Sequence, residues 1–302
     1  MLKAPMKSNV ISILEDSGYT AESYSGCFDI VAKKNKLLII KILQNIDAMH
    51  PENSNNLKII SENLGAHLII VAFRTNIDKL KKGVVYERLG IPAISFETFR
   101  DLIQRGIFPS IYRGRGGLFV EVDKDLIREA RSKRNMTQRE LAEAVGISKK
   151  AIYEHEKQQL KMMLSIADRL EKVLNKKVKK DARIFEHSIT AEKSVPKDKL
   201  EKAVGTQLRR IGFDTNYVKS SPFDIIAKEK SLVISDVESN RKRLERRALP
   251  LKRFISVVKQ PAVMITEKLK YGIFEGIPVI KKDELKELGS SKELIKIAKE
   301  SK

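Results

Sequence analysis

The segment from Thr137 to Glu156 constrains the fold of this chain more than any other, because two short helical patterns there flank Gly-Ile-Ser. Thr137 and Glu140 have the spacing of a capping box, in which each side chain accepts an N–H bond at the start of a helix. Gly146 follows the first pattern, where a left-handed backbone costs glycine least. Ser148 is suited to cap the second helix. The spacing predicts two helices that cross steeply at a short turn.

Apolar residues at helical spacing extend this motif into a small bundle. Leu141, Ala142 and Val145 face a core, and Ile152 anchors the second helix. Further helical patterns cover residues 125–134 and 164–174. Alanine at position 142 lets the two backbones approach closely at the crossing. The alternative interpretation is an ordinary helical hairpin with a glycine turn.

The pattern Gln138…Ala142…Gly146-Ile147-Ser148…Ile152…Glu156 resembles the Cro/cI-type (XRE-type) helix-turn-helix repressors over about residues 124–178. The resemblance implies a lambda-repressor-like all-α domain whose second helix, starting at Ser148, lies in the major groove of duplex DNA. His155 departs from the family, which usually has an apolar or aromatic residue there. We interpret it as a half-buried histidine bonded to a neighbour, with pH sensing as the alternative.

The resemblance assigns DNA contacts to six residues of the two helices. Base or near-base contacts fall to the exposed start of the second helix, and phosphate contacts to the start of the first, where the helix end is positive. The six are Gln138, Arg139, Ser148, Lys149, Lys150 and Tyr153. Arg113 and Arg115 either enter an adjacent minor groove or belong to a solvated turn.

The charge of the chain independently favours a polyanionic partner. Its 302 residues carry 59 Lys and Arg against 39 Asp and Glu, a net charge of +20 at pH 7. Residues 113–185 hold 19 basic and 11 acidic side chains and are the most densely basic part. Such an excess is typical of nucleic-acid binding. The run from Arg241 to Arg253 is interpreted as a solvated helix face, or alternatively as an auxiliary backbone contact.

Other classes of protein are disfavoured. The longest apolar runs have strand length, so we expect no signal peptide, no membrane span and no membrane partner. The one cysteine, Cys27, excludes a disulfide framework and fits a reducing cytoplasm; we expect it to be buried rather than nucleophilic. The four histidines are scattered and no phosphate-binding loop is present, so no cofactor and no metal site are predicted.

The outer parts of the chain resemble each other. Residues 28–33 (FDIVAK) recur as 223–228 (FDIIAK), and Gly90-Ile91-Pro92 recurs as residues 276–278. We infer an internal duplication of one α/β plan; the alternative is two unrelated domains that share a hairpin pattern. The predicted domains are α/β copies at 1–112 and 197–302, a Gly/Arg turn and strand at 113–123, the helix-turn-helix domain at 124–180, and a linker at 181–196.

The repeated hairpin resembles the strand pair of the PD-(D/E)XK (restriction-endonuclease-like) nucleases. There an aspartate, and an acid-x-lysine on the next strand, hold a divalent metal. The first copy offers Asp29, Ile39 and Lys41, and the second offers Asp224, Ile234 and Asp236. An isoleucine replaces the second acid in both, so we predict no catalytic residue and no enzyme. Asp29 and Lys41 would instead form an ion pair.

The whole arrangement resembles a family of archaeal HTH-type transcriptional regulatory proteins. It implies a central lambda-repressor-like domain between two related α/β domains, and a sequence-specific regulator that binds double-stranded DNA in the cytoplasm. One module buries little surface, so we expect a homodimer that reads half-sites about 34 Å apart, with the α/β copies as dimer surfaces. The sequence identifies no effector. The alternatives are a metal-dependent nuclease targeted by the helix-turn-helix, and a non-specific architectural binder of nucleic acid.

Overall fold

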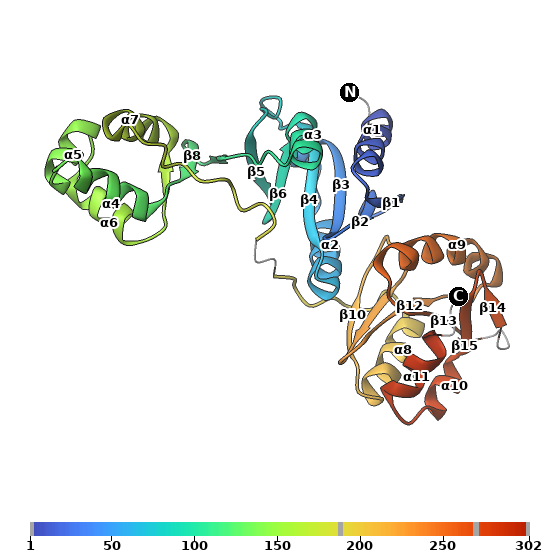
Figure 1. Cartoon of the computed structure of the whole chain (residues 1–302). Helices are drawn as coiled ribbons and strands as arrows, with labels where there is room; N and C mark the ends of the chain where they lie inside the picture. The colour runs from blue at the N-terminus through green and yellow to red at the C-terminus, as the bar shows by residue number, and fades with distance from the viewer. Residues whose placement is uncertain (1–2, 187–189, 268–271, 300–302) are drawn as a thin grey trace. The chain divides into compact units, whose positions relative to one another are not determined.

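The computed structural model describes residues 3–186, 190–267 and 272–299, which form two α/β copies and a helical module (Figure 1). They divide into two compact units. The first unit comprises the described residues of Met1–Leu43, Ala48–Ile70 and Ser188–Lys302. The second comprises those of Gln44–Asp47 and Val71–His187 and contains the helical module. No helix in the described ranges is long and apolar enough to cross a membrane.

The first copy follows the apolar spacing of its sequence. Helix α1 (Lys3–Asp16) buries Met6, Val10, Ile13 and Leu14 along one face, as an amphipathic helix does. The apolar runs of β3 and β4 are buried, as is typical of strands covered on both faces. The other elements are β1 (Thr20–Ser23), β2 (Ile30–Lys33), β3 (Leu37–Asn45), a 3-10 turn η1 (Ile46–Ala48), α2 (Pro51–Leu64), β4 (His67–Arg74), β5 (Val84–Arg88), β6 (Ile91–Ser95) and α3 (Phe96–Arg105).

The second copy repeats this plan. Its elements are α8 (Lys199–Arg210), β10 (Asp214–Tyr217), β11 (Ile225–Lys228), β12 (Leu232–Val237), α9 (Arg241–Val258), β13 (Ala262–Thr266), β14 (Gly272–Phe274), β15 (Ile277–Lys281), α10 (Lys282–Glu287) and α11 (Ser291–Lys299). The strand order β10-β11-β12-β13-β15-β14 matches the order β1-β2-β3-β4-β6-β5 of the first copy. The two outer domains are therefore related, as the sequence predicted.

The glycine of each Gly-Ile-Pro segment lies in a tight turn, and the next strand begins at the isoleucine. Leu89 and Gly90 have φ values of 52° and 77°, and Glu275 and Gly276 have 52° and 81°. Two successive positive φ angles are typical of tight type I′ hairpin turns. These turns pair β5 with β6 and β14 with β15.

Three short strands accompany the helical module, and the first of them, β7, pairs in parallel with β5 of the first copy. It comprises α4 (Lys124–Lys133), α5 (Gln138–Val145), α6 (Lys149–Lys157) and α7 (Leu164–Leu174), with β7 (Ile111–Gly114), β8 (Gly117–Glu121) and β9 (Lys161–Met163). Strand β8 pairs antiparallel with β7 and with β9. The predicted turn at residues 113–117 is thus the end of a β-hairpin. Strand β9 was not predicted, because three residues are too few to show a pattern.

Part of the predicted linker at residues 181–196 is packed. Ala182 and Ile184 are each only 2% exposed, and the Ala182 amide donates to the carbonyl of Pro109 at 2.7 Å. Two apolar residues in a polar stretch gave too weak a signal to predict this burial. Residues 187–189 of the linker lie outside the described residues.

In the first unit the two copies meet through equivalent loops. The Cys27 amide donates to the Ser220 carbonyl at 2.7 Å, and the Phe28 and Phe223 rings both pack against Phe254. Cys27 is buried, as predicted, and burial raises the pKa of its thiol to about 12. A β-carbon on Gly26 would lie 2.1 Å from the Ser220 carbonyl oxygen. Glycine is therefore required where the two backbones touch.

Replacing Gly26 by alanine should destabilise this contact by about 1–3 kcal/mol, since the added methyl group overlaps a backbone carbonyl. Chemical denaturation of the full chain measures the change. Gly289→Ala is the matched control, because its nearest neighbour would be a flexible carboxylate at 3.5 Å. Equal stability of the two variants would show that the copies separate without cost.

Candidate nucleic-acid interface

Local capping fixes the two central helices. The Thr137 hydroxyl accepts from the Glu140 amide at 3.2 Å, and the Glu140 carboxylate accepts from the Thr137 amide at 2.7 Å. Gly146 ends α5 with φ 76°. The Ser148 hydroxyl accepts from the Ala151 amide at 3.1 Å and starts α6. The predicted capping box, glycine turn and serine cap are all present.

An apolar core holds the helices of the module together. Ala142 is 2% exposed, and Leu141, Val145, Ile152 and Ala167 are fully buried. These side chains belong to one cluster that also includes residues from α4, β8 and the segment after α7. Helix α6 packs on both α4 and α5. One face of α6 therefore packs against α4 and α5. The residues on its opposite face remain exposed to solvent.

A buried carboxylate locks this packing. Glu156 is 3% exposed and accepts from Arg131 Nε at 2.6 Å and from Gln138 Nε2 at 2.8 Å. Arg128 also donates to the Glu156 backbone carbonyl at 2.5 Å. The Arg131 pKa is raised by this bond to Glu156. The network ties the last turn of α6 to α4 and to the start of α5.

The six residues predicted to contact DNA fall into two groups of three that differ in their surroundings. Gln138 is half-buried and its amide nitrogen is bonded to Glu156, so that group is directed into the module. Arg139 is exposed and pairs with Glu143 at 2.9 Å on α5. Ser148 uses its hydroxyl as the cap of α6. Gln138 and Arg139 thus lie at the start of α5, and Ser148 lies at the start of α6.

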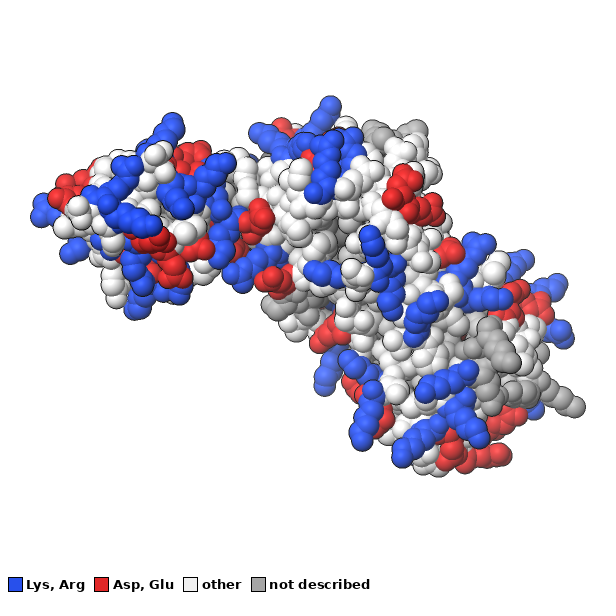
Figure 2. Space-filling model, in the orientation of Figure 1, with Lys and Arg blue, Asp and Glu red and all other residues white. Residues whose placement is uncertain are grey.

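The other three stand on the open side of α6. Lys149 and Lys150 are exposed and form no ion pair within the described ranges, and Tyr153 is 45% exposed. Helical spacing places Tyr153 on the same side as the two lysines, four and three residues further along. Basic side chains lie over the visible face of the helical module, with acidic ones among them (Figure 2). The start of α6 thus offers ammonium and phenol donors to solvent.

Two further basic residues near this surface were missed. The Lys157 ammonium lies 5.5 Å from the centroid of the Tyr153 ring, a position that the four-residue spacing could have indicated. The Arg169 guanidinium lies about 4.0 Å from where a Gly146 β-carbon would stand. Arg169 comes from α7, so no local pattern could place it beside the turn. Arg113 and Arg115 are both exposed, in and just after β7.

His155 is half-buried, but the expected hydrogen bond is absent. Its Nδ1 atom is buried and has no partner among the residues that the structure describes. Burial lowers the pKa of His155 below 6.5. Burial therefore makes this ring harder to protonate than an exposed histidine, at a position where the family usually has an apolar or aromatic residue.

In the first copy, lysines surround the nuclease-like aspartate. Asp29 is 2% exposed, and its carboxylate lies 2.8 Å from Lys3 Nζ and 3.3 Å from Lys41 Nζ. It also accepts from the Ile42 amide at 2.8 Å. The predicted Asp29–Lys41 ion pair is present. With Ile39 fully buried beside it, the position offers one carboxylate and two cations.

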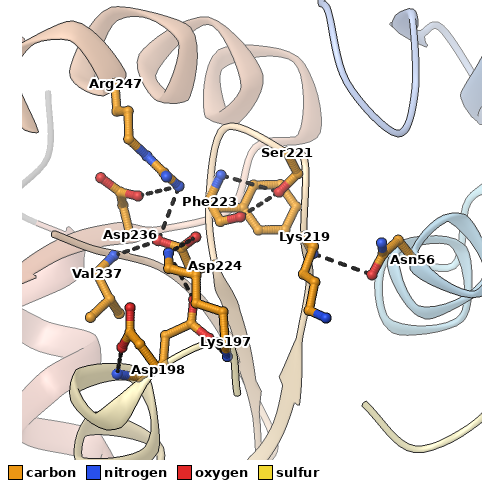
Figure 3. Close-up of polar contacts among 11 residues, drawn as sticks. Asn56, Lys197, Asp198, Lys219, Ser221, Phe223, Asp224, Asp236, Val237 and Arg247 are labelled. Carbon is orange, nitrogen blue, oxygen red and sulfur yellow. Dashed lines mark hydrogen bonds and ion pairs between the residues drawn. The ribbon is translucent and has the colours of Figure 1, made fainter. Parts of the chain in front are cut away.

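In the second copy, a guanidinium fills the same place (Figure 3). Asp224 accepts from the Val237 amide at 2.9 Å, as Asp29 does from Ile42, and lies 2.8 Å from Lys197. Arg247 reaches from α9 to Asp224 at 3.0 Å and to Asp236 at 2.5 Å. The predicted solvated face of residues 241–253 is therefore wrong for Arg247, whose partners are buried acids far away in sequence.

Burial and charge set the protonation of this pair. Burial alone raises the pKa of Asp224, but Arg247 and Lys197 outweigh it and hold that pKa below its usual value. Asp236 is fully buried, and burial raises its pKa well above the usual value against the pull of Arg247. Within the described ranges, no three His, Cys, Asp or Glu side chains are grouped to hold a metal.

Comparisons with known proteins agree with this description. Residues 3–109 match the family described as PD-(D/E)XK superfamily domain, and residues 127–179 match the family described as Helix-turn-helix. The fold and the exposed helix thus define a helix-turn-helix DNA-binding protein with nuclease-like outer domains. The chain belongs to the family of archaeal HTH-type transcriptional regulatory proteins.

Similar relatives match over almost the whole length. One, named "Putative HTH-type transcriptional regulatory protein" in Methanothermobacter thermautotrophicus, is 35% identical and covers 96% of this chain and 94% of its own. Relatives of the same name in Methanobrevibacter smithii and Archaeoglobus fulgidus are 34% and 32% identical, over 99% and 98% of this chain and 98% of their own. No solved structure matches the chain significantly.

Removing the buried carboxylate should loosen the helical module. Glu156→Ala leaves Arg131 and Gln138 without their partner, which should cost about 2–3 kcal/mol. Hydrogen exchange of the α5 and α6 amides measures this local opening. Glu154→Ala is the control, since that side chain bonds only an exposed glutamine on the described surface. Similar exchange in both variants would mean that Glu156 does not fix α6.

Proposed function

We propose that this protein regulates transcription by reading a specific DNA sequence with the start of α6. The proposal is supported by the difference between the two faces of that helix, one packed in the module and one exposed. Ile152 and Glu156 anchor one side in the module, while Lys149, Lys150 and Tyr153 are exposed on the other. A helix held this way fits a major groove, where lysine donates to guanine or to phosphate.

The remaining predicted residues suit positioning roles. Arg139 and the first amides of α5 lie at a positive helix end, which favours a phosphate. The Gln138 amide nitrogen is already bonded to Glu156, so we assign Gln138 chiefly to setting the angle between α5 and α6. Arg169 and Lys157 add positive charge beside the turn and the tyrosine. Phosphate contacts of this kind fix register but carry no sequence information.

We further propose that the protein acts as a homodimer in the cytoplasm, where its DNA is. The interface between DNA and a single four-helix module is too small to distinguish one sequence from others. A second module on a second half-site is therefore needed. The loops around Cys27 and Ser220 contact each other within one chain. The dimer contact therefore uses other surfaces than these equivalent loops.

Selection of bound duplexes from a random pool tests the proposal. The wild-type chain should select a near-palindromic motif. Replacing both Lys149 and Lys150 by alanine should cost about tenfold or more in affinity for that motif and less in affinity for random duplex. Lys133→Ala with Lys172→Ala removes the same charge from α4 and α7 and should keep selectivity. Equal affinity for random and selected duplexes would favour an architectural binder.

We also propose that the outer copies do not cut DNA. Isoleucine stands at the second acid position of each copy, and lysine or arginine neutralises the remaining aspartates. A hard cation such as Mg²⁺ requires several oxygen ligands. Supercoiled plasmid with Mg²⁺ or Mn²⁺ should therefore stay intact. Cleavage that disappears in Asp29→Ala would establish the nuclease alternative.

A further inference from the structure

A cavity of about 370 Å³ lies between the two α/β copies in the first unit. The loop after β1 contributes Tyr24 and Ser25 from the first copy, and α9 contributes Arg247 and Arg253 from the second. Lys7 of α1 completes its polar wall. A volume of this size lies in the range of small-molecule sites. No role described so far for the helix-turn-helix or for the nuclease-like positions requires this cavity.

All the charged side chains that line the cavity are basic. Lys7, Arg247 and Arg253 line it, and none of its lining residues is acidic. Arg247 is held in place from behind by Asp224 and Asp236 (Figure 3). Arg253 is exposed and forms no ion pair in the described part of the chain. Two basic groups from different copies thus line one space: Arg253, and Lys7, whose ammonium also donates to the Tyr24 backbone carbonyl.

Tyr24 lines this cavity between the two copies. It is 8% exposed, and its ring makes edge contacts with the rings of Phe28 and Phe254, whose centroids lie 5.0 Å and 6.0 Å from its own. Its hydroxyl oxygen is enclosed and has no hydrogen-bond partner among the described residues. Tyr24 therefore lines the cavity with atoms other than this enclosed hydroxyl.

We propose that this cavity binds a phosphorylated small molecule of nucleotide size. A phosphate group supplies several acceptor oxygens and two negative charges, which suit the arginine and lysine side chains that line the cavity. The ring of Tyr24 with Pro222 and Pro250 offers apolar surface to the organic part. The site lies in a different unit from α6, so its occupancy does not rest on DNA binding.

Calorimetric titration of the full chain tests the site with three probes: 5′-AMP, inorganic phosphate and adenosine. We expect 5′-AMP and phosphate to bind, and adenosine to bind far more weakly. Arg253→Gln and Lys7→Gln should each weaken 5′-AMP binding about tenfold. Arg246→Gln, an exposed arginine of α9 outside the cavity, should change nothing. Lys149→Ala with Lys150→Ala should also leave 5′-AMP binding unchanged, which separates this site from the DNA surface.

Other results would overturn the proposal. Undetectable binding of 5′-AMP and phosphate, or binding unaffected by both cavity variants, would exclude the site. Equal binding of adenosine would exclude recognition of the phosphate. A short random duplex that displaces 5′-AMP, and that Arg253→Gln weakens equally, would assign the cavity to the DNA backbone instead of a small molecule.

Discussion

Burial of Glu156 is the interaction on which the geometry of the helical module depends. A carboxylate removed from water needs charged and hydrogen-bonding partners, and here these come from α4 and from the start of α5. Because the partners are fixed, the last turn of α6 has one position relative to both helices. The side chains opposite Glu156 and Ile152 then have nowhere to pack and remain available to a ligand.

The two outer copies neutralise a buried aspartate at the same position of the fold in two ways. In the first copy, lysines from α1 and β3 surround Asp29. In the second, an aspartate replaces the lysine, and an arginine from α9 supplies the missing positive charge. Each solution neutralises a buried carboxylate with a side chain instead of an ion. The same exchange leaves Arg247 at the edge of a basic cavity.

Features set by neighbouring residues could be predicted from the sequence. The capping box at Thr137, the turn at Gly146 and the cap at Ser148 depend on contacts within a few residues. The repeat was visible because its strands carry their own apolar pattern. The Asp29–Lys41 pair followed from the register of one hairpin.

Features that join distant residues could not be predicted. The bond between Glu156 and Arg131 spans 25 residues, and nothing local distinguishes Arg247 from the exposed arginines around it. The type I′ turns at Leu89 and Glu275 lack the usual Asn-Gly signal, so the hairpins that they close could not be predicted. Ala182 and Ile184 are buried by tertiary contacts that override a polar neighbourhood.

The central claim is that the start of α6 enters a DNA groove. Amine-reactive labelling of the chain, free and bound to a selected duplex, tests it most directly. The account predicts that Lys149 and Lys150 become protected from the reagent while the exposed Lys133 and Lys172 react as before. Labelling of Lys149 and Lys150 at the same rate in the complex would contradict it.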